Sequence, residues 1–244
     1  MELKVINMYP DILNLYGDIG NLICIKQRCI WRGIDVNIKN LTIDNEVAIE
    51  DADMILIGGG SDNGSRIVSS QLLKQKKELE NFILDEKVIL AISSSYQMFG
   101  NSYSKTNKNN TENKKFPSLE ILDMETFNQR ERLTGNIIIE NNLGIKPYEI
   151  LGFVNHIGET KHNYTPLGSV LLGSKEAEKN EGIIYKNFIG SYLHGPLLPK
   201  NPHLADYMIL SALRNKYDIE SLDNIDDTIE INAHNAVIKR LMKQ

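Results

Sequence analysis

The first third of the chain alternates between strand-like and helix-like patterns of apolar residues. LKVIN, residues 3–7, is a short apolar run typical of a buried strand. Residues 18–33 carry apolar side chains close to a helical period and end at a glycine, which predicts a helix. IDVNIKNL, residues 34–41, alternates apolar and polar positions as a strand does. We therefore expect a strand, a helix and a second strand in this order.

The same order continues along the chain. ADMILIGGG, residues 52–60, is an apolar strand that runs into three glycines, and residues 65–86 form a long amphipathic pattern. KVILAI, residues 87–92, predicts another buried strand, and it ends at three serines. Strands that alternate with helices of this length predict an α/β fold with a doubly wound, mainly parallel sheet and helices on both faces. Ligands bind such sheets at the carboxyl ends of the strands, where the glycines and the serines both lie.

The pattern changes after Gly100. Residues 101–115 are polar and rich in asparagine, which predicts a flexible surface insertion. Short apolar runs follow, and we expect them to extend the sheet or to form hairpins beside it: 119–123, 132–140, 149–155, 169–173, 182–187 and 188–195. Residues 203–217 and 226–244 predict closing helices. No linker or repeat divides the chain, so we expect a single domain over residues 1–244.

Composition excludes several classes of protein. The net charge of −5 and the pI near 5.6 argue against a nucleic-acid-binding face, which needs a surplus of Lys and Arg. There is no run of 18 apolar residues, so no membrane span is expected. The first residues show no basic segment followed by an apolar one, so secretion is not expected either. The two cysteines, Cys24 and Cys29, lie within the first helical pattern and match neither a disulfide framework nor a metal motif. We expect a cytoplasmic protein.

Two strand ends carry candidate chemistry. In IGGGSD, the glycines 58–60 could present backbone N–H groups to an anion, although a turn is the commoner role of three glycines. Ser93 stands between a strand and a short helix, which is where a nucleophile is lifted out of a sheet, but an ordinary helix cap also fits. No GxxxxGK[ST] motif occurs, so an ATP-binding P-loop is not expected.

Histidines supply the candidate general base. His194 lies in GSYLHGP, at the carboxyl end of a predicted strand, and is the best placed of them. His156, in GFVNHIGET, is a second, weaker candidate for the general base. His162, His203 and His234 are expected on the surface.

Together these segments resemble a known family. ISSSYQMFG is similar to the ICGGYQMLG segment of class I glutamine amidotransferases of the cobyric-acid-synthase-like branch, which have a flavodoxin-like fold. The resemblance implies that position 93 is the nucleophile, which is a cysteine in the family, and that Gln97 helps to bind substrate glutamine. It further implies that Gly59 or Gly60 and Ser94 donate backbone N–H groups to the oxyanion and that His194 is the catalytic base.

Within this branch, four segments resemble the GatD glutaminase subunits of lipid II isoglutaminyl synthases: NLYGDIGN, RLTGNIIIE, GFVNHIGET and YLHGPLLPKNP. That likeness implies that Arg132 holds the α-carboxylate of L-glutamine, a task suited to its two-pronged guanidinium. It implies a MurT-like Mur ligase subunit as partner in a heterodimer. That subunit would use ATP and Mg²⁺ to activate the D-glutamate of lipid II for amidation to D-isoglutamine, whereas this chain would need no cofactor.

Ser93 departs from the family pattern. The family reaction passes through a thioester and needs a thiol that ionises readily, with a pKa of about 8.5 or lower, whereas a serine hydroxyl ionises far less easily. We therefore expect this chain to bind glutamine and to hydrolyse it poorly. We interpret Ser93 as an engineered replacement of cysteine, and a naturally inactive paralogue or a working serine enzyme remain the alternatives.

The orienting acid is a second departure. The family places a glutamate two residues after the histidine, where this chain has Pro196. A base oriented by a carboxylate is the general logic of a catalytic triad, so the acid must come from elsewhere in the chain, with Asp18 as a candidate, or from the partner, or be absent. Our hypothesis is that the partner helps to complete the site.

Three other functions compete with this interpretation. A glutaminase for corrin-ring amidation is disfavoured because that enzyme is usually a longer fused chain. A catalytically inactive subunit that binds glutamine as a scaffold would make Ser93 natural. A serine hydrolase should show G-x-S-x-G, but Ala91 and Ser95 occupy the two glycine positions.

Overall fold

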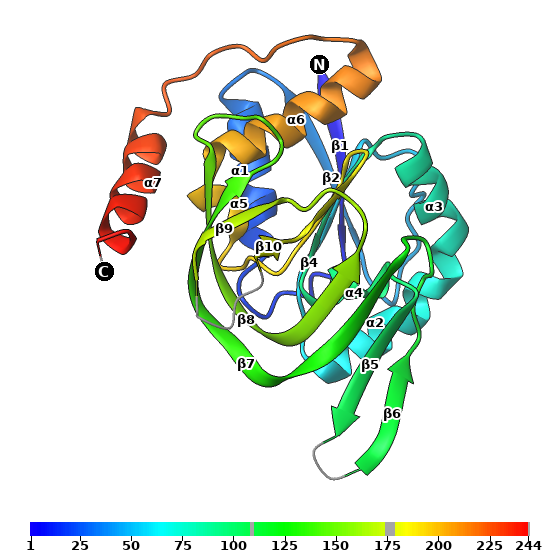
Figure 1. Ribbon diagram of the computed structural model, residues 1–244. Helices are drawn as coiled ribbons and strands as arrows, with labels where there is room; N and C mark the ends of the chain where they lie inside the picture. Colours follow the sequence, from blue (N-terminus) through cyan, green and yellow to red (C-terminus); the bar gives the residue numbers. More distant parts are fainter. Residues whose placement is uncertain (108–109, 174–178, 244) are drawn as a thin grey trace.

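The computed structural model describes residues 1–107, 110–173 and 179–243, and it is built around two sheets (Figure 1). The first sheet has the order β11-β12-β4-β3-β1-β2. These strands span Ile183–Tyr185 (β11), Phe188–Ser191 (β12), Val88–Ile92 (β4), Met54–Ile57 (β3), Glu2–Met8 (β1) and Asp35–Leu41 (β2). All neighbours pair in parallel except β11, which is antiparallel to β12 at one edge.

The central strands are buried along their whole length, as their apolar sequences predict. Every residue of β3, β4 and β12 is buried, which is the usual state of a parallel strand covered on both faces. By contrast, the edge strand β2 exposes alternate residues. The predicted α/β class and the mainly parallel sheet are confirmed.

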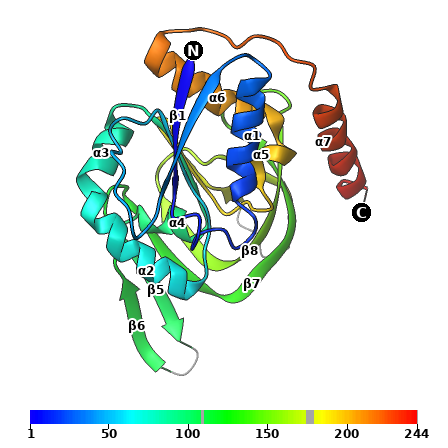
Figure 2. The same ribbon diagram turned by 180° about the vertical axis from the view of Figure 1, so that it is seen from behind.

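Helices cover both faces of this sheet. Figures 1 and 2 show α1 (Ile19–Ile30) and α6 (Pro202–Tyr217) on one face, with α2 (Asp62–Leu72) and α3 (Lys76–Leu84) on the other. The short helices α4 (Ser94–Met98) and α5 (Leu197–Lys200) follow β4 and β12. The segment predicted as one helix over 65–86 begins earlier, because the hydroxyl of Ser61 caps the Gly64 N–H, and a 3₁₀ turn at Leu73–Gln75 divides it.

The second sheet has the order β10-β9-β7-β5-β6, and β8 also pairs with β7. Its strands span Asn180–Glu181 (β10), Gly168–Leu172 (β9), Met124–Asn141 (β7), Ser102–Asn107 (β5), Asn110–Phe116 (β6) and Glu149–His162 (β8). Figure 1 shows β7 and β8 curving around the end of the first sheet toward which β1 runs. A backbone bridge between Phe153 and His194 joins the two sheets at that end.

Several expectations need correction. Residues 119–123 form no strand, because Leu119 and Leu122 are buried in an irregular segment between β6 and β7. The insertion at 101–115 lies largely in the paired strands β5 and β6, and its residues 108–109 lie outside the described residues. The last helix, α7, spans Thr228–Leu241, shorter than the predicted 226–244, and residue 244 lies outside the description.

Two histidines expected on the surface are buried instead. His203 of α6 and His234 of α7 are 8% and 3% exposed, and their rings meet edge to face at 5.0 Å. Burial lowers the pKa of His203 to about 4. The pair lies where α7 docks, with Leu241 of α7 packed against Ile138 and Leu151 of the second sheet. His162 is half-buried. No helix in the described part of the chain is long and apolar enough to cross a membrane.

Candidate active site

Ser93 occupies a sharp turn between β4 and α4. Its φ of 56° and ψ of −115° lie in a region that residues with a Cβ rarely adopt. The N–H of Ser93 donates to the carbonyl of Ser191 at 2.7 Å, which ties the turn to the neighbouring strand β12. Such a strained strand-to-helix turn is the arrangement that exposes a nucleophile at the edge of a sheet.

His194 lies beside this turn and beside Asp18. The Oδ2 atom of Asp18 is 3.7 Å from Nδ1 of His194, and both side chains are almost fully buried. Gly59 separates His194 from Ser93, since a Cβ at position 59 would lie 2.8 Å from His194 Cε1 and 3.2 Å from Ser93 Cβ. The structure therefore brings position 93, His194 and Asp18 together, and only glycine fits at 59. Neither ring nitrogen of His194 has a hydrogen-bond partner among the described residues.

The backbone N–H groups of the glycine turn are engaged within the protein. Gly59 N–H donates to Asp18 Oδ2 at 2.7 Å, and Gly60 N–H donates to the hydroxyl of Ser94 at 3.1 Å. The N–H of Ser94 itself lies in the first turn of α4, where helices have no internal acceptor. Ser95, which is fully buried, donates its hydroxyl to the carbonyl of Gly58 and so fixes α4 to the end of β3.

Arg132 projects from β7 toward β8. Its guanidinium donates to the backbone oxygen of Asn155 at 3.3 Å and to the side-chain oxygen at 3.0 Å. The amide nitrogen of Asn155 in turn donates to the hydroxyl of Tyr16 at 2.6 Å. The Tyr16 ring lies 4.4 Å from that of His194, centroid to centroid. Arg132 is exposed, as a group that binds a substrate carboxylate from solvent must be.

Gln97 belongs to a buried network behind the turn. Its amide nitrogen donates to the Tyr192 hydroxyl at 3.0 Å, and Tyr192 also bonds Thr160, which bonds Thr126. His156 stacks on the Tyr192 ring at 3.9 Å between centroids. Burial lowers the pKa of His156 to about 4, so its ring is neutral near pH 7.

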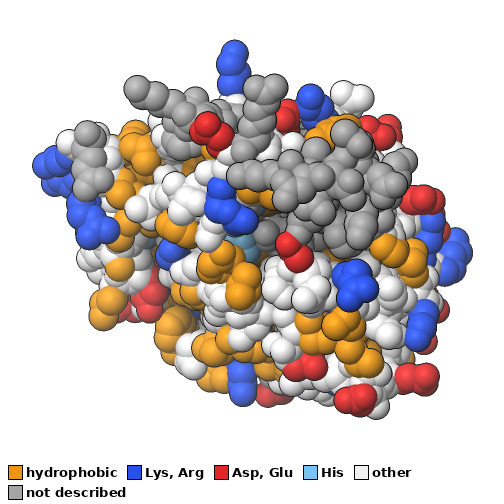
Figure 3. Space-filling view, turned by 90° about the horizontal axis from the view of Figure 1, so that it is seen from below, with side chains coloured by type: hydrophobic (Ala, Val, Ile, Leu, Met, Phe, Trp, Pro, Cys, Tyr) orange, Lys and Arg blue, Asp and Glu red, His pale blue; other side chains and the backbone are white. Residues whose placement is uncertain are grey.

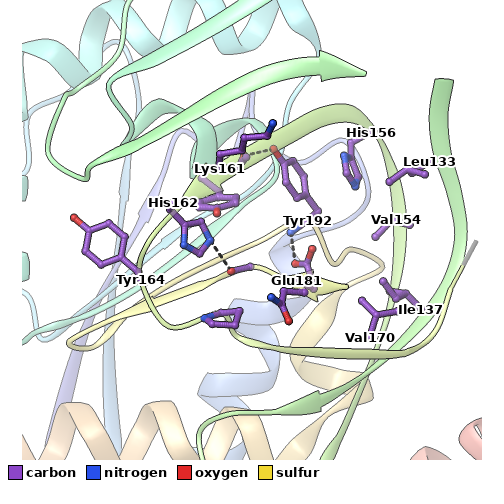
Figure 4. Close-up of a pocket in the computed structure, with 15 residues that line it drawn as sticks. Leu133, Ile137, Val154, His156, Lys161, His162, Tyr164, Val170, Glu181 and Tyr192 are labelled. Atoms are coloured by element: carbon purple, nitrogen blue, oxygen red, sulfur yellow. Dashed lines mark hydrogen bonds between the residues drawn. The ribbon is translucent and has the colours of Figure 1, made fainter. Parts of the chain in front are cut away.

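A cavity of about 400 Å³ is lined by Tyr192 and His156 together with residues of the second sheet (Figure 4). Glu181 of β10 lies in its wall and accepts hydrogen bonds from the Ser191 hydroxyl and the Tyr192 N–H. Burial raises the pKa of Glu181 to about 7. Figure 3, which views the molecule from the side of β7 and β8, shows hydrophobic, acidic and basic side chains mixed over the visible described surface.

The remaining reactive groups are less suited to chemistry. Burial raises the pKa of the thiols of Cys24 and Cys29, both on α1, to about 12, so neither forms a thiolate near neutral pH. Across the described residues, no three His, Cys, Asp or Glu side chains gather as a metal site would require.

Sequence reasoning singled out most of the residues that meet here but missed Tyr16, Asn155 and Tyr192. Tyr16 stands in the NLYGDIGN motif two residues before Asp18, so its place in a motif was the one available signal. Asn155 directly precedes His156, and Tyr192 lies two residues before His194. Their contacts depend on how the second sheet meets the first, which periodicity does not describe.

The sequence is similar to those of known proteins. Residues 4–202 match the model of the CobB/CobQ-like glutamine amidotransferase domain. The chain is 37% identical to lipid II isoglutaminyl synthase (glutamine-hydrolyzing) subunit GatD of Staphylococcus aureus (strain N315), over 100% of this chain and 98% of that one. It is 32% identical to the protein of the same name from Streptococcus pneumoniae (strain ATCC BAA-255 / R6), over 88% and 82%.

The fold has counterparts among solved structures. A glutamine amidotransferase from Thermotoga maritima superposes with a TM-score of 0.56 at 13% identity, over 99% of each chain. That likeness concerns the fold alone. The match to the family model and the two relatives show the family as well as the fold. The chain belongs to the CobB/CobQ-like glutamine amidotransferase family.

Proposed function

We propose that this chain is the glutaminase subunit of a lipid II isoglutaminyl synthase. It would hydrolyse L-glutamine and deliver ammonia to a MurT-like ligase that amidates the D-glutamate of lipid II. The identification of the staphylococcal and pneumococcal relatives as subunits of lipid II isoglutaminyl synthase supports this pathway. The observation that carries the glutaminase chemistry is the meeting of the strained turn at position 93 with His194 and Asp18 around Gly59.

The reaction assigns a role to each group in the form that has cysteine at position 93. The thiolate attacks the side-chain amide carbon of glutamine, and His194 holds the thiol proton and returns it to the departing ammonia. The resulting thioester is cleaved by water, which yields glutamate and frees the thiol. The N–H of Ser94 and that of Gly60, once Gly60 exchanges its bond to the Ser94 hydroxyl, stabilise the oxyanion of both steps.

Substrate binding draws on the second sheet. Arg132 grips the α-carboxylate of glutamine, and Gln97 holds the substrate from behind the turn. Asp18 orients His194 and so replaces the glutamate that the family has at the position of Pro196. The chain then supplies this acid itself. ATP and Mg²⁺ belong to the partner ligase in this proposal.

Ser93 itself favours a second candidate function. A chain that keeps the glutamine pocket but has a weak nucleophile could serve as a glutamine-binding scaffold for its partner. The two candidates differ in whether any form of the site releases ammonia.

The deciding experiment measures glutamine-dependent ammonia release from this chain and from Ser93→Cys, each with a MurT-like ligase, ATP and lipid II present. We expect the cysteine variant to release ammonia and to yield amidated lipid II, and the serine form to be slower by at least about a thousandfold because its hydroxyl ionises poorly. Lack of ammonia release from both forms would reject the glutaminase and favour the scaffold. Ammonia release without amidated lipid II would keep the glutaminase and reject the proposed acceptor.

A further inference from the structure

A continuous set of contacts joins the exposed arginine to the buried histidine. It runs from Arg132 on β7 through Asn155 on β8 to Tyr16 in the loop before α1, and then to His194 after β12. Four segments that are far apart in the sequence thus meet through two side chains, Asn155 and Tyr16, to which neither the sequence nor the comparisons assign a role.

The Tyr16 ring forms one wall of the space that holds His194. His194 is 1% exposed and has no hydrogen bond to its ring among the described residues, so packing and the nearby Asp18 carboxylate fix the ring. Tyr16 contacts it with an interplanar angle of 52°, and Gly59 closes in near Cε1. Without the aromatic ring at position 16, the imidazole would be free to turn and would meet water.

The Tyr16 hydroxyl acts at the other end, through Asn155. The oxygen of the Asn155 amide accepts from Arg132 at 3.0 Å and from the Thr134 hydroxyl at 3.2 Å, while its nitrogen donates to Tyr16 at 2.6 Å. Because an amide has one accepting end and one donating end, these bonds together set its orientation. Loss of the Tyr16 hydroxyl would leave the donating end of the amide without this acceptor, so that only the bonds to its oxygen would orient it, and would loosen the guanidinium that it holds.

We propose that Tyr16 is a positioning residue that couples recognition of the substrate carboxylate by Arg132 to placement of the base His194. This inference rests on the proposed glutaminase function. The two parts of the side chain act on different kinetic constants. The hydroxyl acts through Asn155 on glutamine binding, and the ring acts through His194 on the chemical step.

The test compares Tyr16→Phe and Tyr16→Ala in the Ser93→Cys chain, assembled with its partner ligase. Tyr16→Phe keeps the ring, so we expect KM for glutamine to rise about fivefold, the value of one hydrogen bond, with kcat within about twofold of the parent. Tyr16→Ala should raise KM similarly. It should also lower kcat by about tenfold or more, because displacing a catalytic group slows the chemical step by at least this factor. Tyr9→Phe is the matched control, since it also removes one tyrosine hydroxyl bond, that to Gln75, but lies outside the site.

A double-mutant cycle tests the route through the amide. If Tyr16 acts through Asn155, then Tyr16→Phe should add nothing to the rise in KM caused by Asn155→Ala. If the rise in KM of the double variant equals the product of the rises in the two single variants, the coupling is overturned. An unchanged KM in Tyr16→Phe would also overturn it. A loss of thermal stability in Tyr16→Phe with no change in KM would assign a merely structural role and would also overturn it. The Ser93→Cys chain with Tyr16 intact separates failure of this inference from failure of the proposed function. If the proposed function is wrong, that chain itself releases no ammonia.

Discussion

One carboxylate oxygen serves two groups of the site. Oδ2 of Asp18 accepts the Gly59 N–H at 2.7 Å and lies 3.7 Å from His194 Nδ1. The second distance exceeds that of a hydrogen bond, so Asp18 acts on the imidazole through its charge. Catalytic hydrogen bonds are often long before substrate binds. Asp18 can therefore both hold the glycine turn and stabilise the imidazolium that forms when His194 takes a proton.

Asp18→Asn separates these two tasks. An asparagine oxygen can still accept from Gly59, but the negative charge beside His194 is lost. In the Ser93→Cys background we expect kcat for ammonia release to fall by about a hundredfold or more, as when the acid of a catalytic triad is neutralised, while the Tm changes little. Asp53→Asn is the control, because Asp53 pairs with Lys216 just before β3, at the opposite end of that strand from Gly59.

The result also decides where the orienting acid comes from. If Asp18→Asn keeps full activity in the assembled complex, the orienting acid is not Asp18, and either the partner subunit supplies it, as the hypothesis of a site completed by the partner requires, or the site works without one. If activity is lost equally with and without the partner, the chain supplies the acid itself.

At the scale of elements, Glu181 links the two-residue strand β10, which pairs with β9, to the first sheet. Its carboxylate accepts from the Ser191 hydroxyl at 2.7 Å and from the Tyr192 N–H at 2.8 Å, which attaches β10 to the end of β12. Burial opposes the charged form and raises the pKa from 4.5 to about 7. The folded protein therefore holds this proton more tightly than the unfolded chain does, and the stability gained from it is complete below pH 4.5 and lost as pH rises through 7.

Glu181→Gln should remove that pH dependence. We expect the free energy of unfolding of the variant, minus that of the parent, to rise by about 3 kcal/mol between pH 4.5 and pH 8, because the amide keeps an accepting oxygen and carries no charge. Urea denaturation at several pH values measures the difference. Glu140→Gln, at an exposed position of β7, should show no such trend. A flat difference for Glu181→Gln as well would contradict the raised pKa.

Elements that follow a local rule were predictable, and those formed by distant pairing were not. The strands β3 and β4 and the helix α1 follow from apolar runs and periods within the segments themselves. The strands β7 and β8 are much longer than the apolar runs at 132–140 and 149–155, because their polar ends pair with each other, as Thr126 does with Thr160. The burial of His203 and His234 arises where α7 returns to the body, which no local pattern encodes.

The site shows the same division. Ser93 and the glycines 58–60 are predictable because they end buried parallel strands, where ligands bind. The contact of Arg132 with Asn155 depends on the register of β7 against β8, which is interrupted between Asn128 and Leu133. Since a shift of one residue turns side chains to the other face of a sheet, sequence alone could suggest Arg132 only through family likeness.

At the scale of the whole molecule, the site lies where the two sheets meet. The first sheet supplies position 93, the glycine turn and His194 from its carboxyl end, and the second sheet closes over them with Arg132 and Asn155. A ligand that bridges both sheets would bind the folded protein and not the unfolded chain, so it should raise the stability of the entire fold. This consequence does not require the reaction to proceed.

Glutamine should therefore stabilise the chain even with serine at position 93. At a concentration of about 100 times Kd, we expect L-glutamine to raise the Tm by about 5 °C or more in a thermal melt, from the mass action of one site on a chain of this size. Arg132→Met should abolish most of the shift if Arg132 binds the substrate carboxylate as proposed, whereas Arg66→Met, which changes an exposed arginine on α2, should keep it. D-glutamine presents its carboxylate in the wrong direction and should shift the Tm less than L-glutamine. An equal shift with both enantiomers, or a shift that survives Arg132→Met, would place the carboxylate elsewhere and would remove the second sheet from substrate recognition.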